Sequence, residues 1–284
     1  MDGSQLITQI TSSKNMLAQR LIVAIVFIPL GVLIVSLGGW FLAAGVMLGL
    51  GYGAWEYWRL FRKGGYRPSA PLLILGVVGL ALVRQIQQSP NSDVVLAAVV
   101  LAAMAVHLFQ FEKGDKASAI DFNITVGGIL YLGWLGSYII SLRGLPDGTW
   151  WLLLVLPAVW FADGAAYFVG SHFGRHKMSV RASPNKSWEG YLGGVVAAAL
   201  GCLLLASLWH LRSPAVTPMK GLILGLVVAA VSPLGDLGES MLKRGFGVKD
   251  TSQLLPGHGG IMDRIDSWLW AAPIGYYLII FALT

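Results

Sequence analysis

Nine segments of about twenty mostly apolar residues follow one another along the chain, and this pattern constrains the fold more than any other feature. A helix needs about 20 apolar residues to cross the hydrocarbon core of a bilayer. Only 12% of the residues are charged, against roughly 25% in an ordinary soluble domain, so the polar surface is too small to cover a globule. We therefore predict an all-α, polytopic integral membrane protein with about nine transmembrane helices, near residues 19–38, 40–59, 70–88, 93–111, 121–141, 149–170, 188–209, 218–236 and 264–283.

The distribution of lysine and arginine predicts how these helices are oriented. Short cytoplasmic loops carry an excess of both residues. If the N-terminus is inside, sixteen of the twenty fall on the cytoplasmic side, and the other four are Arg84, Arg143, Arg212 and Lys220. We therefore expect a cytoplasmic N-terminus and a C-terminus on the opposite side. The polar stretch before Leu21 is followed by no cleavage pattern, so we expect the first segment to stay as a helix.

Two groups of membrane helices are expected, with no soluble domain of useful length between them. Residues 1–120 would form about four N-terminal helices. Residues 121–284 would form about five C-terminal helices that carry the chemistry, with cytoplasmic loops at 171–187 and 237–263. Cys202 is the only cysteine, which excludes an intrachain disulfide. The net charge of +6 fits orientation and attraction to anionic lipid, and we expect no nucleic-acid partner.

Carboxylates lie at the cytoplasmic ends of four predicted helices. Asp163 is in the last third of the sixth segment, Glu189 opens the seventh, Asp236 ends the eighth, and Asp263 and Asp266 open the ninth. Ionisable residues within membrane spans are costly and tend to be functional. Because the loops at this layer also carry most of the basic residues, we predict the functional site there.

The stretch from Ser232 to Asp266 is the densest in polar residues. On a helix, Asp236, Glu239 and Lys243 share one face with Ser240. Mg²⁺ commonly uses one or two carboxylates plus substrate phosphates, and carboxylates at two helix ends, Asp236 and Asp263, suit it. Basic residues around such a metal suit a polyphosphate, so this stretch indicates phosphoryl or nucleotidyl transfer at the membrane surface.

Several residues of the same stretch have a structural alternative. Asp266, Asp250 and Arg244 could form ion pairs that only stabilise the fold. His258, in the glycine-rich turn 256–260, could be an acid or a metal ligand, or a turn histidine that is hydrogen-bonded to backbone. Such a turn before a helix lets backbone N–H groups face an anion.

A second polar block runs from Arg181 to Gly190. Ser183 or Ser187 could cap the seventh helix, which is the structural alternative to binding a ligand. Lys186 lies at the same helix start, where a bound phosphate would gain from the ammonium and from free N–H groups.

A third cluster consists of Trp55, Tyr57 and Trp58 with Glu56 and Arg59. Tryptophan and tyrosine are enriched at membrane–water interfaces. We therefore favour an interfacial aromatic belt over a binding site here.

Four blocks of the sequence resemble the phosphatidate cytidylyltransferase family, whose members are also called CDP-diacylglycerol synthases. SMLKRGFGVKDTSQLLPGHGGIMDRID at 240–266 matches the family pattern in residue type and spacing. WFADGAAYFVG at 160–170, SPNKSWEG at 183–190 and SPLGDLGES at 232–240 look like three further blocks.

This resemblance implies a reaction, a cofactor and a location. The reaction is transfer from CTP to phosphatidic acid, which gives CDP-diacylglycerol and pyrophosphate in phospholipid biosynthesis. The resemblance also implies Mg²⁺ held chiefly by Asp236 and Asp263, a homodimer, and a multi-pass protein of the inner membrane whose active site faces the cytoplasm. Whether a second, monovalent cation takes part is left open.

Roles for individual residues follow from the motifs. Asp236, Lys243, Asp263 and Arg264 are the expected catalytic residues. The expected substrate-binding residues are Asp163, Ser183, Asn185, Lys186, Ser187, Glu189, Glu239, Ser240, Arg244, Lys249, Asp250, His258 and Asp266.

Two other functions would use similar features. A CTP-dependent membrane lipid kinase would need the same metal and nucleotide, but it would release CDP instead of pyrophosphate. A membrane transporter would place its polar residues near the midplane, whereas here they cluster at one face.

Overall fold

Helices make up almost all of the structure, a computed structural model that describes residues 28–87, 92–252, 254 and 259–283. An apolar helix, Ile28–Leu37, comes first. The other elements, in chain order, are α2 (Gly39–Lys63), α3 (Ala70–Gln87), α4 (Ser92–Glu112), α5 (Ser118–Gly128), the π-helix η1 (Ile129–Trp134), α6 (Tyr138–Gly144), α7 (Gly148–Phe173), β1 (Lys177–Ser179), β2 (Ser183–Ser187), α8 (Trp188–Trp209), α9 (Pro218–Val231), α10 (Pro233–Gly245), α11 (Met262–Ile265), α12 (Trp268–Leu278) and the π-helix η2 (Ile279–Leu283).

Six helical stretches of the described chain are long and apolar enough to cross a membrane. They are Asp93–Glu112, Ser118–Gly144, Gly148–Phe173, Trp188–Trp209, Pro218–Gly245 and Met262–Leu283. Ile28–Leu37 and Ala70–Ile86 are shorter apolar helices, and α2 covers the remaining predicted segment. All nine predicted segments are therefore helical where they are described, although residues 19–27 lie outside the described part. The prediction of an all-α, polytopic membrane protein is confirmed, with nine as an approximate count.

Helix interruptions shape the C-terminal half of the chain. The stretch from Ser118 to Gly144 changes from α5 to η1 and then to α6, and π-helical turns often occur at functional sites. A new helix, α10, begins at Pro233, whose fixed φ and missing N–H fit the first turn of a helix. Pro157 has no such effect, because α7 continues through it.

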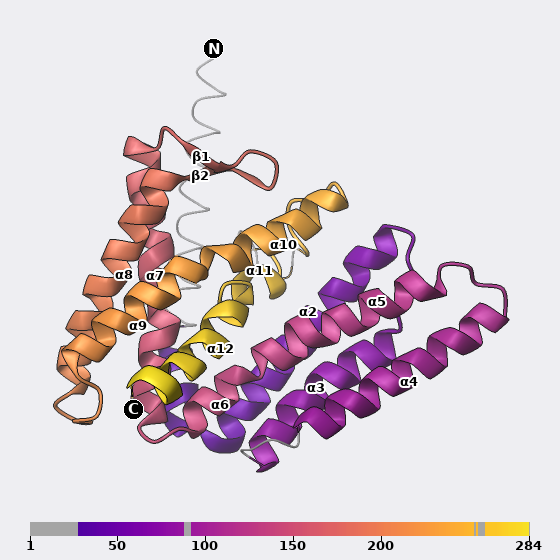
Figure 1. Cartoon of the computed structure of the whole chain (residues 1–284), viewed down its shortest axis with the longest axis horizontal. Helices are drawn as coiled ribbons and strands as arrows, with labels where there is room; N and C mark the ends of the chain where they lie inside the picture. The colour runs from indigo at the N-terminus through magenta and orange to yellow at the C-terminus, as the bar shows by residue number, and fades with distance from the viewer. Residues whose placement is uncertain (1–27, 88–91, 253, 255–258, 284) are drawn as a thin grey trace, which may run out of the picture.

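The helices form two groups, and α10, α11 and α12 lie between them (Figure 1). One group contains α2 to α5, and the other contains α7, α8 and α9. The central elements join both groups, since α12 contacts α7 and α9 while α11 contacts α2. The described parts of the polar stretch from Ser232 to Asp266 therefore lie at the junction. The division of the chain at residue 120 stays a prediction, and α5 packs against α3 and α4.

Glycines let the backbones of α7, α8 and α9 approach closely. A Cβ atom on Gly194 of α8 would come within 2.6 Å of the Ala162 carbonyl oxygen of α7. A Cβ atom on Gly225 of α9 would come within 2.5 Å of the Ala198 carbonyl oxygen of α8. Small residues at helix contacts are typical of membrane proteins, where dispersion contacts drive association.

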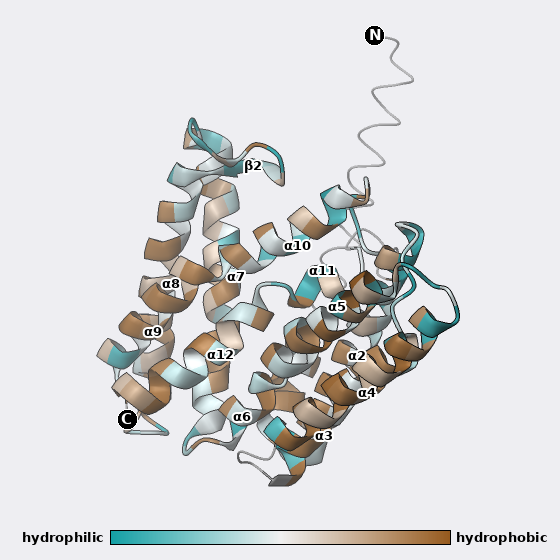
Figure 2. Cartoon of the chain, turned by 45° about the vertical axis from the view of Figure 1, so that its right-hand side comes forward, coloured by the Kyte–Doolittle hydropathy of each residue, from teal (hydrophilic) through white to brown (hydrophobic). Residues whose placement is uncertain are grey.

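Hydrophobic residues predominate along the long helices (Figure 2), and many of their side chains are exposed. Leu101, Leu204 and Phe281 are 69%, 64% and 80% exposed, respectively. Continuous apolar faces of this kind fit a lipid surrounding. Hydrophilic residues gather at the β1–β2 hairpin, at the α4–α5 connection and at α11 (Figure 2).

Both predicted polar loops contain regular structure. The loop 171–187 holds the antiparallel hairpin β1–β2. The loop 237–263 begins as helix, because α10 continues to Gly245, and it ends as helix, because α11 starts at Met262.

Candidate active site

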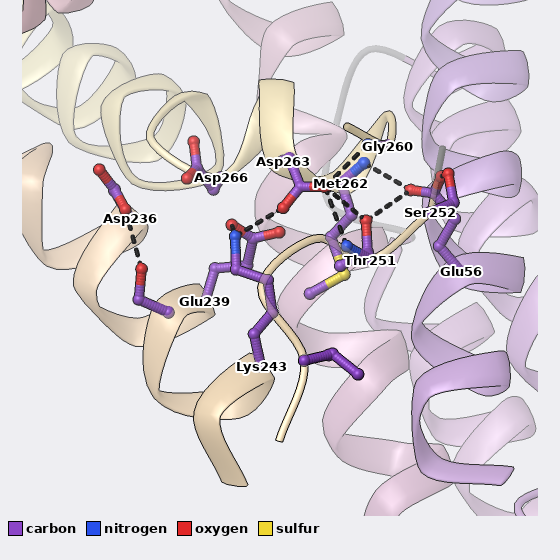
Figure 3. A network of polar contacts seen from close by, with 12 residues as sticks. Glu56, Asp236, Glu239, Lys243, Thr251, Ser252, Gly260, Met262, Asp263 and Asp266 are labelled. Atoms are coloured by element: carbon purple, nitrogen blue, oxygen red, sulfur yellow. Dashed lines mark hydrogen bonds and ion pairs between the residues drawn. The ribbon is translucent and has the colours of Figure 1, made fainter. Parts of the chain in front are cut away.

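Lys243 lies between two carboxylates at the junction of the helix groups (Figure 3). Its Nζ is 2.7 Å from Glu239 Oε2, one turn earlier on α10, and 2.5 Å from Asp263 Oδ1 on α11. The side chains of Lys243, Glu239 and Asp263 are only 10%, 1% and 5% exposed. Buried charges persist in proteins when they are paired and hydrogen-bonded, and this lysine serves two acids at once.

Backbone groups fix the second oxygen of Asp263. Oδ2 accepts hydrogen bonds from the N–H of Gly260 at 2.8 Å, the N–H of Thr251 at 3.0 Å and the Thr251 hydroxyl at 2.8 Å. Gly259 has φ +76°, and a Cβ atom there would lie 2.8 Å from Asp263 Oδ2. Gly259 and Gly260, the described end of the predicted glycine-rich turn, therefore lie against the Asp263 carboxylate.

Glu56 of α2 joins the same network, although the sequence-based interpretation did not count it as a site residue. It is fully buried, and it accepts hydrogen bonds from the N–H groups of Ile261 and Met262 and from the hydroxyls of Thr251 and Ser252 (Figure 3). The available signal was an acid in the interior of a predicted membrane helix.

The interpretation of the cluster next to Glu56 as an interfacial aromatic belt is wrong for Tyr57, whereas it stays a prediction for Trp55 and Trp58. The Tyr57 side chain is buried and its hydroxyl donates to the Ile124 carbonyl. The Trp58 indole N–H donates to the Pro68 carbonyl. The Tyr57 ring therefore packs inside the protein, whereas the Trp58 side chain is only partly buried.

Asp236 connects α10 to the hairpin. Its Oδ2 is 2.6 Å from Lys186 Nζ, and its Oδ1 accepts from the Ser240 hydroxyl at 3.2 Å. Lys186, which was predicted to bind phosphate, thus pairs with a carboxylate here. Both side chains are partly exposed, at 24% for Lys186 and 34% for Asp236, so this pair is more accessible than the one at Lys243.

Two more acids complete an acidic cluster, which we define as Asp163, Asp236, Glu239, Asp263 and Asp266. Asp163 interacts electrostatically with Asp236, Lys186 and Arg264. Asp266 interacts with Asp236 and Asp163, and its Oδ1 accepts from the Ser267 N–H. The five carboxyl groups of the acidic cluster therefore outnumber the three cations beside them, Lys186, Lys243 and Arg264.

The acidic cluster fits a divalent cation by its chemistry. No group of three metal-ligating residues occurs in the described part of the chain, but Mg²⁺ commonly needs only one or two carboxylates plus substrate phosphates. Glu239 Oε1 is buried, and within the described residues no hydrogen-bond donor reaches it. A buried carboxylate oxygen without a donor is an acceptor that a cation would satisfy.

The remaining predicted residues divide into structural contacts and exposed positions. Ser187 caps α8 by accepting from the Gly190 N–H at 3.2 Å, as the capping alternative predicted. Glu189 holds the hairpin base, since it accepts from the N–H groups of Arg175 and His176 and lies 2.6 Å from the His176 ring. Arg244 donates to the Val248 carbonyl beyond the end of α10.

Four other predicted residues lie away from these contacts. Ser183 and the exposed Asn185 are in β2, and Lys249 and Asp250 are exposed after α10. Arg264 is exposed on α11, where it interacts electrostatically with Asp163. His258 lies outside the described residues.

Comparison with known proteins identifies the family. The sequence model described as "Cytidylyltransferase family" matches residues 18–282. The chain belongs to the cytidylyltransferase family. Phosphatidate cytidylyltransferase of Synechocystis sp. is 34% identical to it, over 93% of this chain and 97% of the relative. The protein of that name from Pseudomonas aeruginosa is 35% identical over 91% and 95%, and the one from Haemophilus influenzae is 45% identical over 48% of each chain.

Family membership confirms the resemblance found in the four sequence blocks. The longest block, 240–266, supplies the central contacts of the site: Glu239 directly precedes it, and Lys243, Thr251, Gly260 and Asp263 belong to it. The family motif therefore corresponds to one physical unit in this chain.

Proposed function

We propose that this membrane enzyme transfers the cytidylyl group of CTP to phosphatidic acid, giving CDP-diacylglycerol and pyrophosphate. The observation that carries the proposal is that the family motif builds the centre at Lys243, Glu239 and Asp263. Two relatives named phosphatidate cytidylyltransferase, which match this chain over more than nine-tenths of its length, support it.

The reaction is a displacement at the α-phosphorus of CTP. A phosphate oxygen of phosphatidic acid forms a bond to the α-phosphorus, and the bond from that phosphorus to the oxygen bridging to the β-phosphate breaks. Pyrophosphate leaves with the bonding electrons. Because both reactants are anions, the site must lower their repulsion and stabilise the charge that develops on the leaving group.

Basic residues around the acidic cluster would supply part of this stabilisation. Lys186 and Arg264 are at least partly exposed beside Asp163, so they can bind phosphates at the mouth of the site. Lys243 is more deeply placed and held in position by Glu239 and Asp263. Its fixed ammonium would meet the reacting phosphates without reorganising, which is the form in which a charge stabilises a transition state best.

Mg²⁺ is the proposed cofactor, held by Asp236 and Asp263 with Asp163 and Glu239 as possible additional ligands. When bound, it would neutralise phosphate charge and polarise the reacting phosphoryl group. The excess of carboxyl groups and the buried Glu239 Oε1, which no donor among the described residues reaches, support this assignment. Whether a monovalent cation joins it is a further part of the same question.

The proposed surroundings are the inner membrane, with the site facing the cytoplasm, and a homodimeric assembly. The excess of lysine and arginine on the cytoplasmic side supports the orientation. Phosphatidic acid would then enter laterally from the cytoplasmic leaflet while CTP arrives from the cytosol.

An assay of purified protein in detergent micelles with CTP, phosphatidic acid and Mg²⁺ tests the proposal. We expect CDP-diacylglycerol and pyrophosphate in equal amounts. Formation of CDP instead would indicate a lipid kinase. No reaction by a well-folded preparation would exclude both functions.

A further inference from the structure

Glu56 is a buried carboxylate that holds two segments far from it in the sequence. Oε1 accepts from the Ser252 hydroxyl at 2.5 Å and from the Ile261 N–H at 3.2 Å. Oε2 accepts from the Met262 N–H at 2.7 Å and contacts the Thr251 hydroxyl at 3.3 Å. One side chain of α2 therefore binds residues 251–252, within the connection from α10 to α11, and residues 261–262, at the start of α11 (Figure 3).

The helix α11 depends on this distant carboxylate for its cap. The first N–H groups of a helix need acceptors from outside the helix, and the local N-cap residue, Ile261, offers no side-chain acceptor. Glu56 supplies one from α2, at Ile261 and Met262. No lysine or arginine of the described chain pairs with Glu56 at ion-pair distance, so these donors are what offset its burial.

Glu56 and Asp263 hold the same two segments from opposite sides. Thr251 contacts both carboxylates, and its single hydroxyl proton favours Asp263, at 2.8 Å, over Glu56, at 3.3 Å. Gly260 donates to Asp263, and a Cβ atom there would overlap the Glu56 carboxylate and the Thr251 hydroxyl. The position of the Asp263 carboxylate therefore depends on the hydrogen bonds that Glu56 accepts from Ile261 and Met262, directly before Asp263 in the chain.

We propose that Glu56 is a positioning residue for Asp263, and through Asp263 for Lys243, in the reaction proposed above. It makes this contribution without touching the substrate. The inference rests on the proposed function for its kinetic consequence, whereas its structural consequence, the fixed start of α11, can be measured separately.

The substitution Glu56→Gln tests the proposal because it keeps the size and one acceptor oxygen of the side chain. Its NH₂ group would face a hydroxyl or N–H donor where an oxygen now accepts. We expect kcat to fall about 10- to 100-fold, since small misplacements of reacting groups have effects of this size. The Mg²⁺ concentration for half-maximal rate should rise, and amide hydrogen exchange should accelerate in the peptide that spans Gly260–Met262.

A matched control is Asp121→Asn. Asp121 of α5 is also fully buried. It accepts a hydrogen bond from the Arg67 N–H at 2.7 Å, and no hydrogen bond joins it to Thr251 or α11 among the described residues. The control variant should keep the wild-type Mg²⁺ profile and the wild-type exchange at Gly260–Met262, even if its thermal stability falls as much as that of Glu56→Gln.

Two results would overturn the proposal. One is a Glu56→Gln enzyme with wild-type kcat. The other is a loss of activity that follows thermal stability alone, with an unchanged Mg²⁺ profile and unchanged exchange at α11. If Glu56→Gln does not fold, Ser252→Ala removes one donor and leaves the carboxylate, and we expect smaller shifts in the same directions; no shift in either measurement would also refute the idea. A wild-type enzyme that makes no CDP-diacylglycerol would instead refute the proposed function, while the exchange measurement still reports on Glu56.

Discussion

Replacing Lys243 by methionine should destabilise the protein far more than replacing Glu239 beside it by glutamine. Within the described part of the chain, Lys243 is the one cation that pairs with Glu239 and Asp263, and all three side chains are at most 10% exposed. Methionine keeps the unbranched length of the side chain but removes the ammonium. The negative carboxylates of Glu239 and Asp263 would then face each other without the ammonium between them, where little water can screen their repulsion.

The expected loss of stability follows from this arrangement of charges. Removing one partner of a buried ion pair costs about 3–5 kcal/mol, because the other charge is left uncompensated. At about 2–4 °C per kcal/mol for domains of this size, Lys243→Met should lower Tm by roughly 6–20 °C. Glu239→Gln leaves Lys243 paired with Asp263 and removes a carboxylate whose Oε1 has no donor in the described chain, so its cost should stay near 1 kcal/mol.

Thermal unfolding of both variants in detergent, followed by tryptophan fluorescence, measures this difference. The buffer should contain a chelator and no nucleotide, so that bound cations do not replace the ammonium. Lys63→Met, at the exposed end of α2, is the control and should change stability by less than about 0.5 kcal/mol. Equal loss of stability in Lys243→Met and Glu239→Gln, or none in Lys243→Met, would refute the reasoning.

Three further predictions concern single contacts. Asp263→Asn should remove measurable turnover with the fold retained, because the amide cannot replace the charge beside Lys243; wild-type kcat in this variant would remove Asp263 from the reaction. Gly260→Ala should cost about 1–3 kcal/mol in the free energy of unfolding, since its Cβ would overlap Thr251 and Glu56. Gly238→Ala, which has open space, should be neutral or stabilising, and equal unfolding midpoints for the two would contradict the packing argument. Ser187→Ala should lower stability by about 1 kcal/mol through loss of the α8 cap and leave KM for CTP unchanged; a large rise in KM would show that Ser187 binds nucleotide.

The sequence predicts the membrane helices and the main polar residues of the site well. Apolar segment length is a local property, and it sets the helices before any tertiary contact is known. The face shared by Asp236, Glu239 and Lys243 follows from helical spacing alone, and the structure retains it on α10. The long motif contains both Lys243 and Asp263, but their pairing across twenty residues is visible only in the structure.

Contacts between distant segments could not be read from such patterns. Glu56 reaches residues about two hundred positions further on, and the aromatic residues around it favoured an interfacial interpretation. The pairing of Lys186 with Asp236 depends on where the hairpin folds relative to α10. The end of α10 at Gly245, beyond the predicted span, reflects capping by residues after it, such as the Val248 N–H, which donates to the Lys243 carbonyl at 3.0 Å.

The central claim is that the acidic cluster is a site of cytidylyl transfer, and positional labelling of CTP tests it most directly. Purified protein is incubated with phosphatidic acid, Mg²⁺ and CTP that carries radioactive phosphorus at either the α- or the γ-position, with Asp263→Asn as the control. We predict that the α-label enters the lipid, that the γ-label appears in pyrophosphate, and that the variant transfers neither. Appearance of the γ-label in the lipid, or transfer of the α-label by Asp263→Asn at the wild-type rate, would contradict the account.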